Sequence, residues 1–191
     1  MNLANDRRWK RFNDREFECP CCGQTFGGVF DIGCDHPDPW PHGSLRDTDQ
    51  ETLVVGQDKL SSDLCAFAGG YYIRCILPLP VLGSDQSFAY GVWASVKDEN
   101  FNAYVNAWQN DDYSDFPGCF AWLMNDLPGW ATEDWLPCGL ETGDGGDRPV
   151  LWVHEDRHPL ATAQREGITF DRLLDLYAAA GTDIRPHLAD A

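Results

Sequence analysis

Cysteine is the residue type whose spacing in this sequence most clearly indicates chemistry. Cys19 and Cys22 are separated by two residues and followed by Gly23. This C-x2-C-G spacing is typical of a zinc knuckle, in which a tight turn directs two thiolates at one ion. We therefore expect Cys19 and Cys22 to bind zinc. We leave Cys21 out of the site, because a side chain beside the knuckle is expected to point away from it.

Two different pairs of residues could complete the zinc site. The local pair is Cys34 and His36, which gives the pattern C-x2-C-x11-C-x-H. The other pair is Cys65 and Cys75, if a three-residue hairpin loop places them opposite each other; a two-residue loop would place Cys65 opposite Arg74 instead. A site closed by four protein ligands is structural, since catalysis needs an open coordination position.

The sequence contains no recognisable catalytic motif. G-x-S-x-G, the P-loop, the dinucleotide glycine fingerprint and H-E-x-x-H are all absent. His158 precedes Pro159, which favours a helix-capping role for that histidine. No catalytic residue is therefore predicted. An alternative site is a pocket formed by Trp93, His158 and Gln164 that would bind a small molecule or a substrate, although tryptophans at strand and helix spacing are more often part of a core.

The elements that must position these residues begin with a predicted hairpin. Gly69 and Gly70 separate two β-rich runs, residues 64–67 and 71–77, and a third run covers residues 88–96. From Asp98 the apolar residues recur at helical spacing up to Trp108. Later runs predict further strands and two helices, the first starting at Pro159 and the second capped by Thr169.

This order of elements predicts an α+β fold. We expect a largely antiparallel sheet that contains a β-meander, with flanking helices. Residues 1–16 are expected to be a polar N-terminal arm. Residues 17–191 are expected to form a single α+β domain that includes a cysteine-rich, zinc-knuckle-like segment at residues 17–42.

Charge restricts the classes of partner. The sequence has 14 basic and 31 acidic residues, and its net charge is −17. Such a surface repels nucleic-acid phosphates and anionic lipids, so neither nucleic acid nor a membrane is an expected partner, whereas a basic protein is. The sequence contains neither an apolar run of membrane-spanning length nor a secretory signal. We therefore expect a cytoplasmic protein whose cysteines are thiols or metal ligands.

Several blocks together resemble a bacterial family, domain of unknown function 2199. The blocks extend in order over residues 17 to 170. The resemblance implies no known activity, but it supports joint action of Cys19, Cys22 and Cys65. Members of that family commonly carry a histidine shortly after C-x2-C-G, where this chain has Phe26. The matching blocks are Cys19-x-x-Cys22-Gly23, Ser62-Asp63-Leu64-Cys65, Tyr72-Ile73-Arg74, Leu79-Pro80, Tyr90-Gly91-Val92-Trp93-Ala94-Ser95, Asn100-Phe101, Leu127-Pro128-Gly129-Trp130 and His158-Pro159-Leu160-Ala161 with Gln164 and Gly167-Ile168.

These observations favour a metal-stabilised, acidic, protein-binding module. Small acidic proteins that lack a catalytic constellation often act as immunity- or antitoxin-like partners. This expectation rests on analogy with that class of protein. The rival hypothesis is a small-molecule-binding protein or enzyme that uses the pocket near Trp93, His158 and Gln164. A third is a redox-responsive protein that uses the thiol of Cys21 or Cys34.

Overall fold

Five strands close into a barrel at the centre of the computed structural model, which describes residues 3–114, 116–131, 135–142 and 147–189. Four neighbouring pairs are antiparallel, and a parallel bridge between Ile76 and Val150 closes the ring. The barrel strands are β5 (Gly70–Pro80), β6 (Ser87–Val96), β7 (Cys119–Leu123), β8 (Pro137–Glu141) and β9 (Val150–Val153).

The prediction of an α+β fold is confirmed, but the sheet is mixed and closed instead of a simple meander. The reason lies in β5, which is eleven residues long and pairs with β4 (Leu64–Phe67), β6 and β9. A strand of this length can pair with β4 near its start and with β9 further along, while it also pairs with β6. Alternation of apolar and polar residues indicates which face of a strand is buried, but it does not indicate that the last strand returns to the first.

The hairpin between β4 and β5 has a register that the sequence analysis did not consider. Its loop is Ala68-Gly69, and both residues have positive φ, 49° and 77°. Two successive residues with positive φ suit a tight hairpin turn. In this register Cys65 lies opposite Tyr72, so the expected pairing with Cys75, and the alternative pairing with Arg74, are both wrong.

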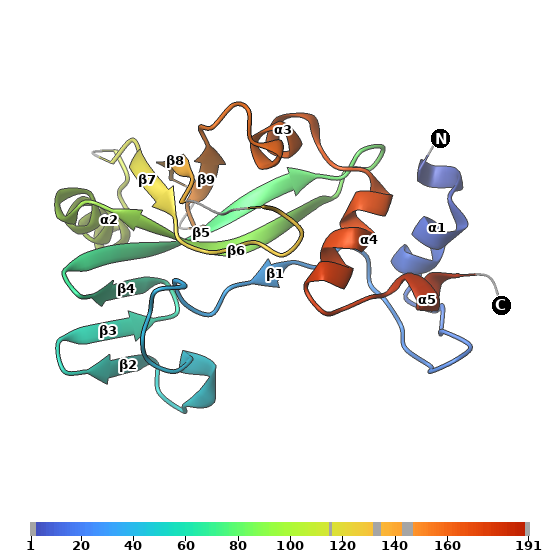
Figure 1. Ribbon diagram of the computed structural model, residues 1–191, viewed down its shortest axis with the longest axis horizontal. Coiled ribbons are helices and arrows are strands. Elements are labelled where there is room, and N and C mark those ends of the chain that lie inside the picture. The colour runs from blue at the N-terminus through green and yellow to red at the C-terminus, as the bar shows by residue number, and fades with distance from the viewer. Residues whose placement is uncertain (1–2, 115, 132–134, 143–146, 190–191) are drawn as a thin grey trace.

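A ribbon of short strands extends the sheet away from the barrel. β2 (Thr52–Val55), β3 (Asp58–Ser61) and β4 pair in antiparallel order and join the barrel through β5 (Figure 1). On the other side of the sheet, the two-residue strand β1 (Ile32–Gly33) pairs in parallel with β6. The chain from β1 to β2, with the 3-10 turn η2 (Leu45–Asp47), runs alongside this ribbon.

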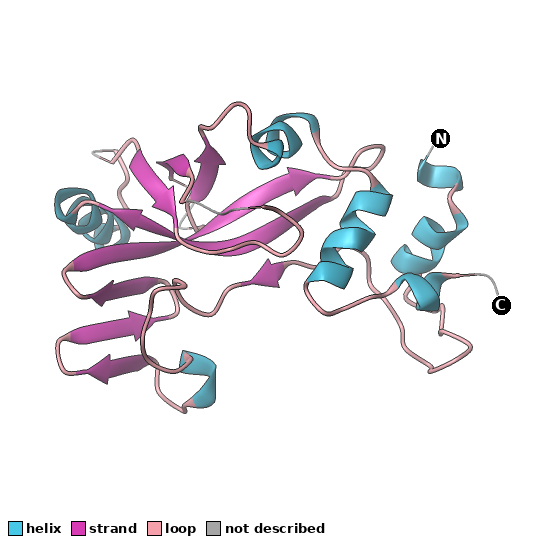
Figure 2. Cartoon of the chain, viewed as in Figure 1, coloured by secondary structure: helices cyan, strands magenta, loops and turns pink. Residues whose placement is uncertain are grey.

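Helices gather at the end of the molecule that carries both termini (Figures 1 and 2). These are the 3-10 turn η1 (Leu3–Asn5), α1 (Arg7–Asn13), α4 (Phe170–Ala179) and α5 (Arg185–Leu188); α2 (Asp98–Asn110) and α3 (Pro159–Glu166) lie against the barrel. In α1, Trp9 and Phe12 are buried, and both rings pack against Phe170, with centroids 5.0 Å and 5.7 Å away. Residues 7–13 therefore form a helix that packs on the core through Trp9 and Phe12, and not the polar arm that we expected.

Two groups of buried side chains support the fold. The larger one fills the barrel and reaches α1, α3 and α4, while a smaller one, which includes Trp40, Cys65 and Trp93, lies outside the barrel under the β2–β4 ribbon. Among the described residues, no helix has the length and apolar character needed to cross a bilayer. The core thus leaves the cysteine-rich loop and α5 at one end of the molecule.

Candidate metal centre

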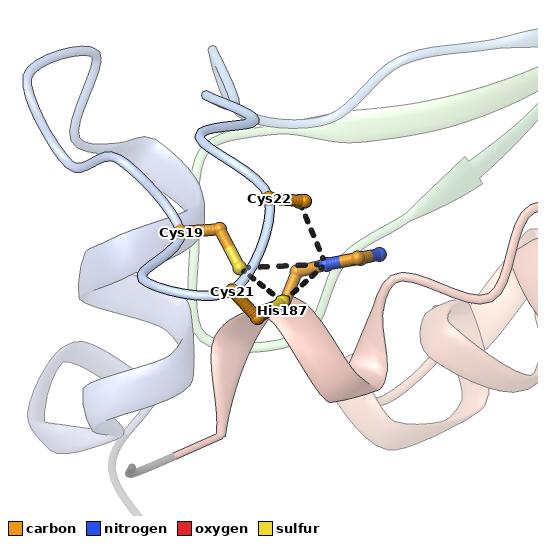
Figure 3. A group of neighbouring side chains, drawn as sticks. All are labelled: Cys19, Cys21, Cys22 and His187. Atoms are coloured by element: carbon orange, nitrogen blue, oxygen red, sulfur yellow. Dashed lines mark hydrogen bonds between the residues drawn. The ribbon is translucent and has the colours of Figure 1, made fainter.

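Three cysteines and one histidine converge where the two ends of the chain meet. The ligand atoms of Cys19, Cys21, Cys22 and His187 all lie within 4.8 Å of one another. Nδ1 of His187 lies 3.4 Å from Sγ of Cys19, 3.4 Å from Sγ of Cys22 and 3.7 Å from Sγ of Cys21 (Figure 3). No other group of this kind occurs in the part of the chain that the structure describes.

These separations match the requirements of a four-coordinate metal. Around a tetrahedral zinc ion with usual bond lengths, sulfur and nitrogen ligands lie about 3.6 Å apart, and two sulfurs about 3.8 Å apart. The three distances from Nδ1 of His187 to sulfur fall close to the first value. Sγ of Cys19 and Sγ of Cys21 are closer than the second value, at 3.1 Å, as a hydrogen-bonded pair of thiols. The four side chains therefore fit a Cys3His metal site.

A tight turn places the three thiols on one side of the loop. The amides of Cys22 and Gly23 both donate to the carbonyl of Cys19, at 3.3 Å and 2.8 Å, and Gly23 has φ of 71°. The amide of Cys19 in turn donates to the carbonyl of Gln24, which closes the loop. In a strand, Cys21 and Cys22 would lie on opposite faces. In this turn the thiol of Cys21 lies with those of Cys19 and Cys22, so our exclusion of Cys21 does not agree with the structure.

His187 reaches the loop because α5 is held against α1. Leu188 is fully buried, and its carbonyl accepts a hydrogen bond of 2.8 Å from Arg11 of α1. The imidazole also packs against Phe26, with ring centroids 6.2 Å apart. Phe26 is the position at which the family resemblance leads us to expect a histidine. Here the imidazole near that position comes from the opposite end of the chain.

The thiols at the site differ in proton affinity. The hydrogen bond from Cys21 is the largest influence on Cys19 and lowers its pKa to about 6, with a smaller contribution from His187. The same contact raises the pKa of Cys21 to about 11. The pair therefore shares one proton near neutral pH, and the Cys19 thiolate provides a negative charge. A bound cation would favour the thiolate form of both. Cys19 is buried, whereas Cys21 and Cys22 are exposed.

The cysteine loop lies within the region that identifies the family. A family model described as "Uncharacterized protein conserved in bacteria (DUF2199)" matches residues 18–168, which is most of the 191-residue chain. The chain belongs to the DUF2199 family. The match includes all three clustered cysteines and ends before His187, so the family model covers three of the four ligands of the DUF2199 chain. No curated protein and no solved structure matches the chain.

The expected local ligands lie elsewhere in the DUF2199 chain. Cys34 packs beside the core, its carbonyl accepts a hydrogen bond from Nε1 of Trp93, and burial raises its pKa to about 12. Nδ1 of His36 donates to the carbonyl of Pro37 at 2.9 Å. The amide of Cys34 is tied to the carbonyl of Gly91 on β6, so this segment follows the sheet and does not approach Cys19. The expected ligand set of Cys19, Cys22, Cys34 and His36 is thus not assembled.

The alternative pair of cysteines is also separated. Cys65 belongs to the smaller buried group and Cys75 to the barrel core. Because Cys65 lies opposite Tyr72, it shares a face with even-numbered residues of β5, and Cys75 points to the other face. Burial raises the pKa of Cys65 to about 12 and holds that of Cys75 well above its usual value. Both are core thiols.

The three residues of the expected pocket have other partners. Trp93 is fully buried, and its amide donates to Oδ1 of Asn125. Gln164 is 5% exposed and bridges α3 to β9, accepting from the amide of Val153 and donating to the carbonyl of Leu151. His158 caps α3 through Nδ1, which accepts from the amide of Leu160, as its place before Pro159 predicts. Trp93 and Gln164 are therefore held inside the packed core, and the ring of His158 is engaged at the start of α3.

Proposed function

We propose that this chain is a zinc-stabilised acidic module that binds a basic protein. The observation that carries the zinc part is the convergence of Cys19, Cys21, Cys22 and His187 within 4.8 Å. Three thiolates and an imidazole are a common ligand set for structural zinc. Four protein ligands fill the coordination sphere, so the ion would hold the structure together and would have no free position for a substrate.

The zinc ion would stabilise the end of the molecule that has the least support from the barrel. α5 contains only four residues, and a helix of that length is not stable by itself. The cysteine loop has little apolar surface of its own. An ion coordinated by both segments would fasten the loop to α5 and hold α5 against α1. The metal centre would thus be part of the framework of the proposed module.

An aromatic surface on the barrel supports the protein-binding part. Phe120 and Trp122 alternate on the outward face of β7 and are 50% and 41% exposed. Their rings pack edge to face with centroids 5.2 Å apart. Trp135, just before β8, is 62% exposed. We call Phe120, Trp122 and Trp135 the aromatic surface. Exposed aromatic residues are enriched at protein interfaces.

Charge indicates what kind of partner this surface would accept. Tryptophan faces attract arginine and lysine, and the net charge of −17 favours a basic partner at long range. On neighbouring strands, Nε1 of Trp152 donates to Oε2 of Glu141 at 2.9 Å, which places a carboxylate beside another ring. An immunity- or antitoxin-like protein, which acts by binding, is the class that we propose.

A pull-down from the native host at low salt tests this proposal. The expected result is a basic protein that is retained by the wild type, lost when salt is raised, and lost from Trp122→Ala. Trp108→Ala is the matched control, because Trp108 is 50% exposed on α2 and is not part of the aromatic surface. Recovery of no basic partner, or equal recovery by Trp122→Ala, would contradict the protein-binding role.

A further inference from the structure

A second polar site lies outside the barrel, where Arg46, Arg74 and Arg148 of this acidic chain lie near one another. A cavity of about 280 Å³ lies between η2 and the turn that joins β3 to β4. It is lined by Arg46, Arg74, Asp35 and three serines, Ser44, Ser61 and Ser62. None of these residues belongs to the metal centre or to the aromatic surface.

Arg74 is the arginine of this cavity that lacks an acidic partner among the described residues. The carboxylates nearest to it are engaged elsewhere: Oδ1 of Asp63 lies 2.7 Å from Nε of Arg148, and Oδ1 of Asp35 lies 2.7 Å from Nε of Arg46. Among the described residues, Arg74 forms no ion pair. Its guanidinium makes one long hydrogen bond, 3.4 Å from Nη1 to the carbonyl of Ser62. The group is half-buried, and buried charges normally have a partner.

Two glycines leave room for the guanidinium, and a tryptophan ring lies beside it. A Cβ atom on Gly33 would lie 3.0 Å from Nη2 of Arg74, and one on Gly91 would lie 3.7 Å from it. The absence of a side chain at Gly33 therefore gives Arg74 its room. The guanidinium carbon lies 5.8 Å from the ring centroid of Trp93, its cross-strand neighbour, within cation–π distance. Arg74 is thus a preorganised donor with most of its N–H groups unpaired.

We propose that this cavity binds a small oxyanion, such as a carboxylate or a phosphate group, with Arg74 as its principal ligand. The fork of a guanidinium matches two oxygens of such a group, and the anion would neutralise a charge that the protein leaves unpaired. Arg46 pairs with Asp35 through Nε and supplies further N–H donors at the rim. The hydroxyls of the three serines already donate to Asp35, to the carbonyl of Leu64 and to Asp63, so the arginines are the donors. The surrounding acidity acts against long polyanions, while a small anion needs only the local field of the cavity.

Isothermal titration calorimetry with inorganic phosphate and with acetate, in a chloride-free buffer, tests the proposal. We expect one saturable site for at least one of the two anions in the wild type. Arg74→Gln should weaken that binding by about tenfold or more, because it removes charged hydrogen bonds. Arg165→Gln is the matched control, because it removes the same charge from an exposed arginine elsewhere. Arg165 lies on α3 and pairs with Asp156 in the loop before that helix.

A second variant guards against loss of folding in Arg74→Gln. The side chain of Arg46 is 69% exposed, so Arg46→Gln should fold normally. The substitution should also weaken anion binding, since it removes a donor and frees Asp35 to face Arg74. Anion binding should raise the melting temperature of the wild type. Three results would overturn the proposal: no saturable binding of either anion by the wild type, binding by a folded Arg74→Gln variant equal to that of Arg165→Gln, or equal binding by the Arg46→Gln and Arg165→Gln variants.

Discussion

Sγ of Cys19 and Nδ1 of His187 lie 3.4 Å apart, although 168 positions separate the two residues in the chain. This contact joins the cysteine loop after α1 to the last helix of the chain. Arg11 of α1 also contacts Leu188 of α5, so α5 is linked both to the cysteine loop and to α1. An ion held by Cys19 and His187 would therefore secure both ends of the chain against each other.

Removal of the metal should loosen these ends and leave the barrel intact. With a chelator, amide exchange should become faster in residues 18–25 and in α5, because the loop is mostly exposed and α5 has only four residues, although Leu188 is buried. The long pairing of β5 with β6 should keep its protection. Hydrogen exchange measured by mass spectrometry, with and without chelator, checks this. Unchanged exchange at the ends, or equal loss of protection in β5 and β6, would contradict it.

The stability contributed by Asp6 should depend on pH. The carboxylate of Asp6 caps α1 by accepting from the amide of Arg8 at 2.8 Å, and it pairs with Nη2 of Arg8 at 2.7 Å. The side-chain hydrogen bond from Arg8 is the main reason why the pKa of Asp6 lies below its usual value. A pKa that is lower in the folded than in the unfolded protein stabilises the fold above the unfolded value, about 3.9, and this stabilisation is lost as the pH falls.

Two substitutions separate the cap from the charge. Asp6→Ala should lower the free energy of unfolding by about 1 kcal/mol at pH 7, because it removes the cap, or about 2–4 °C in melting temperature. Asp6→Asn should lose less, since asparagine also caps helices, and its difference from the wild type should disappear at acid pH. Asp156→Asn, at a side chain that is 89% exposed, is the control. A wild-type-to-Asn difference that persists in acid would rule out this account of Asp6.

Gln164 should act in stability and not in metal binding. Its amide satisfies Val153 and Leu151 of β9, and Gln164→Leu would leave both backbone groups unpaired in a buried site. Each such loss costs about 1–3 kcal/mol, so we expect a melting temperature lower by roughly 4–8 °C or more with unchanged zinc content. Gln109→Leu, at an exposed position of α2, should change little. A selective loss of zinc in Gln164→Leu would show that the two regions are coupled.

The candidate site could be predicted in part from the sequence. The C-x2-C-G spacing selects Cys19 and Cys22 because the two positions suit one tight turn. Cys21 is missed because the knuckle spacing selects only positions 19 and 22, but hydrogen bonds to the carbonyl of Cys19 make residues 19–23 a turn in which the Cys21 thiol joins the other two. His187 has no local signal, since the loop that it meets lies 165 positions or more away. The fourth ligand could be any of the five histidines, and no spacing rule selects among them.

The fold shows the same limit between local and long-range information. The helix starts at His158 and Thr169 follow from local capping chemistry, and both are confirmed. The hairpin register follows from two positive φ angles at Ala68 and Gly69, and alanine gives no indication of a positive φ. Closure of the barrel depends on a parallel bridge at Ile76, a contact between segments far apart in the chain.

Metal analysis of two histidine variants tests the central claim most directly. Zinc would be measured by inductively coupled plasma mass spectrometry on purified wild type, His187→Ala and His36→Ala, with protein concentration measured in parallel. We predict about one zinc per chain in the wild type and in His36→Ala, and a large loss in His187→Ala with a lower melting temperature. The absence of zinc from the wild type, or loss of zinc from His36→Ala while His187→Ala retains it, would contradict the proposed metal centre.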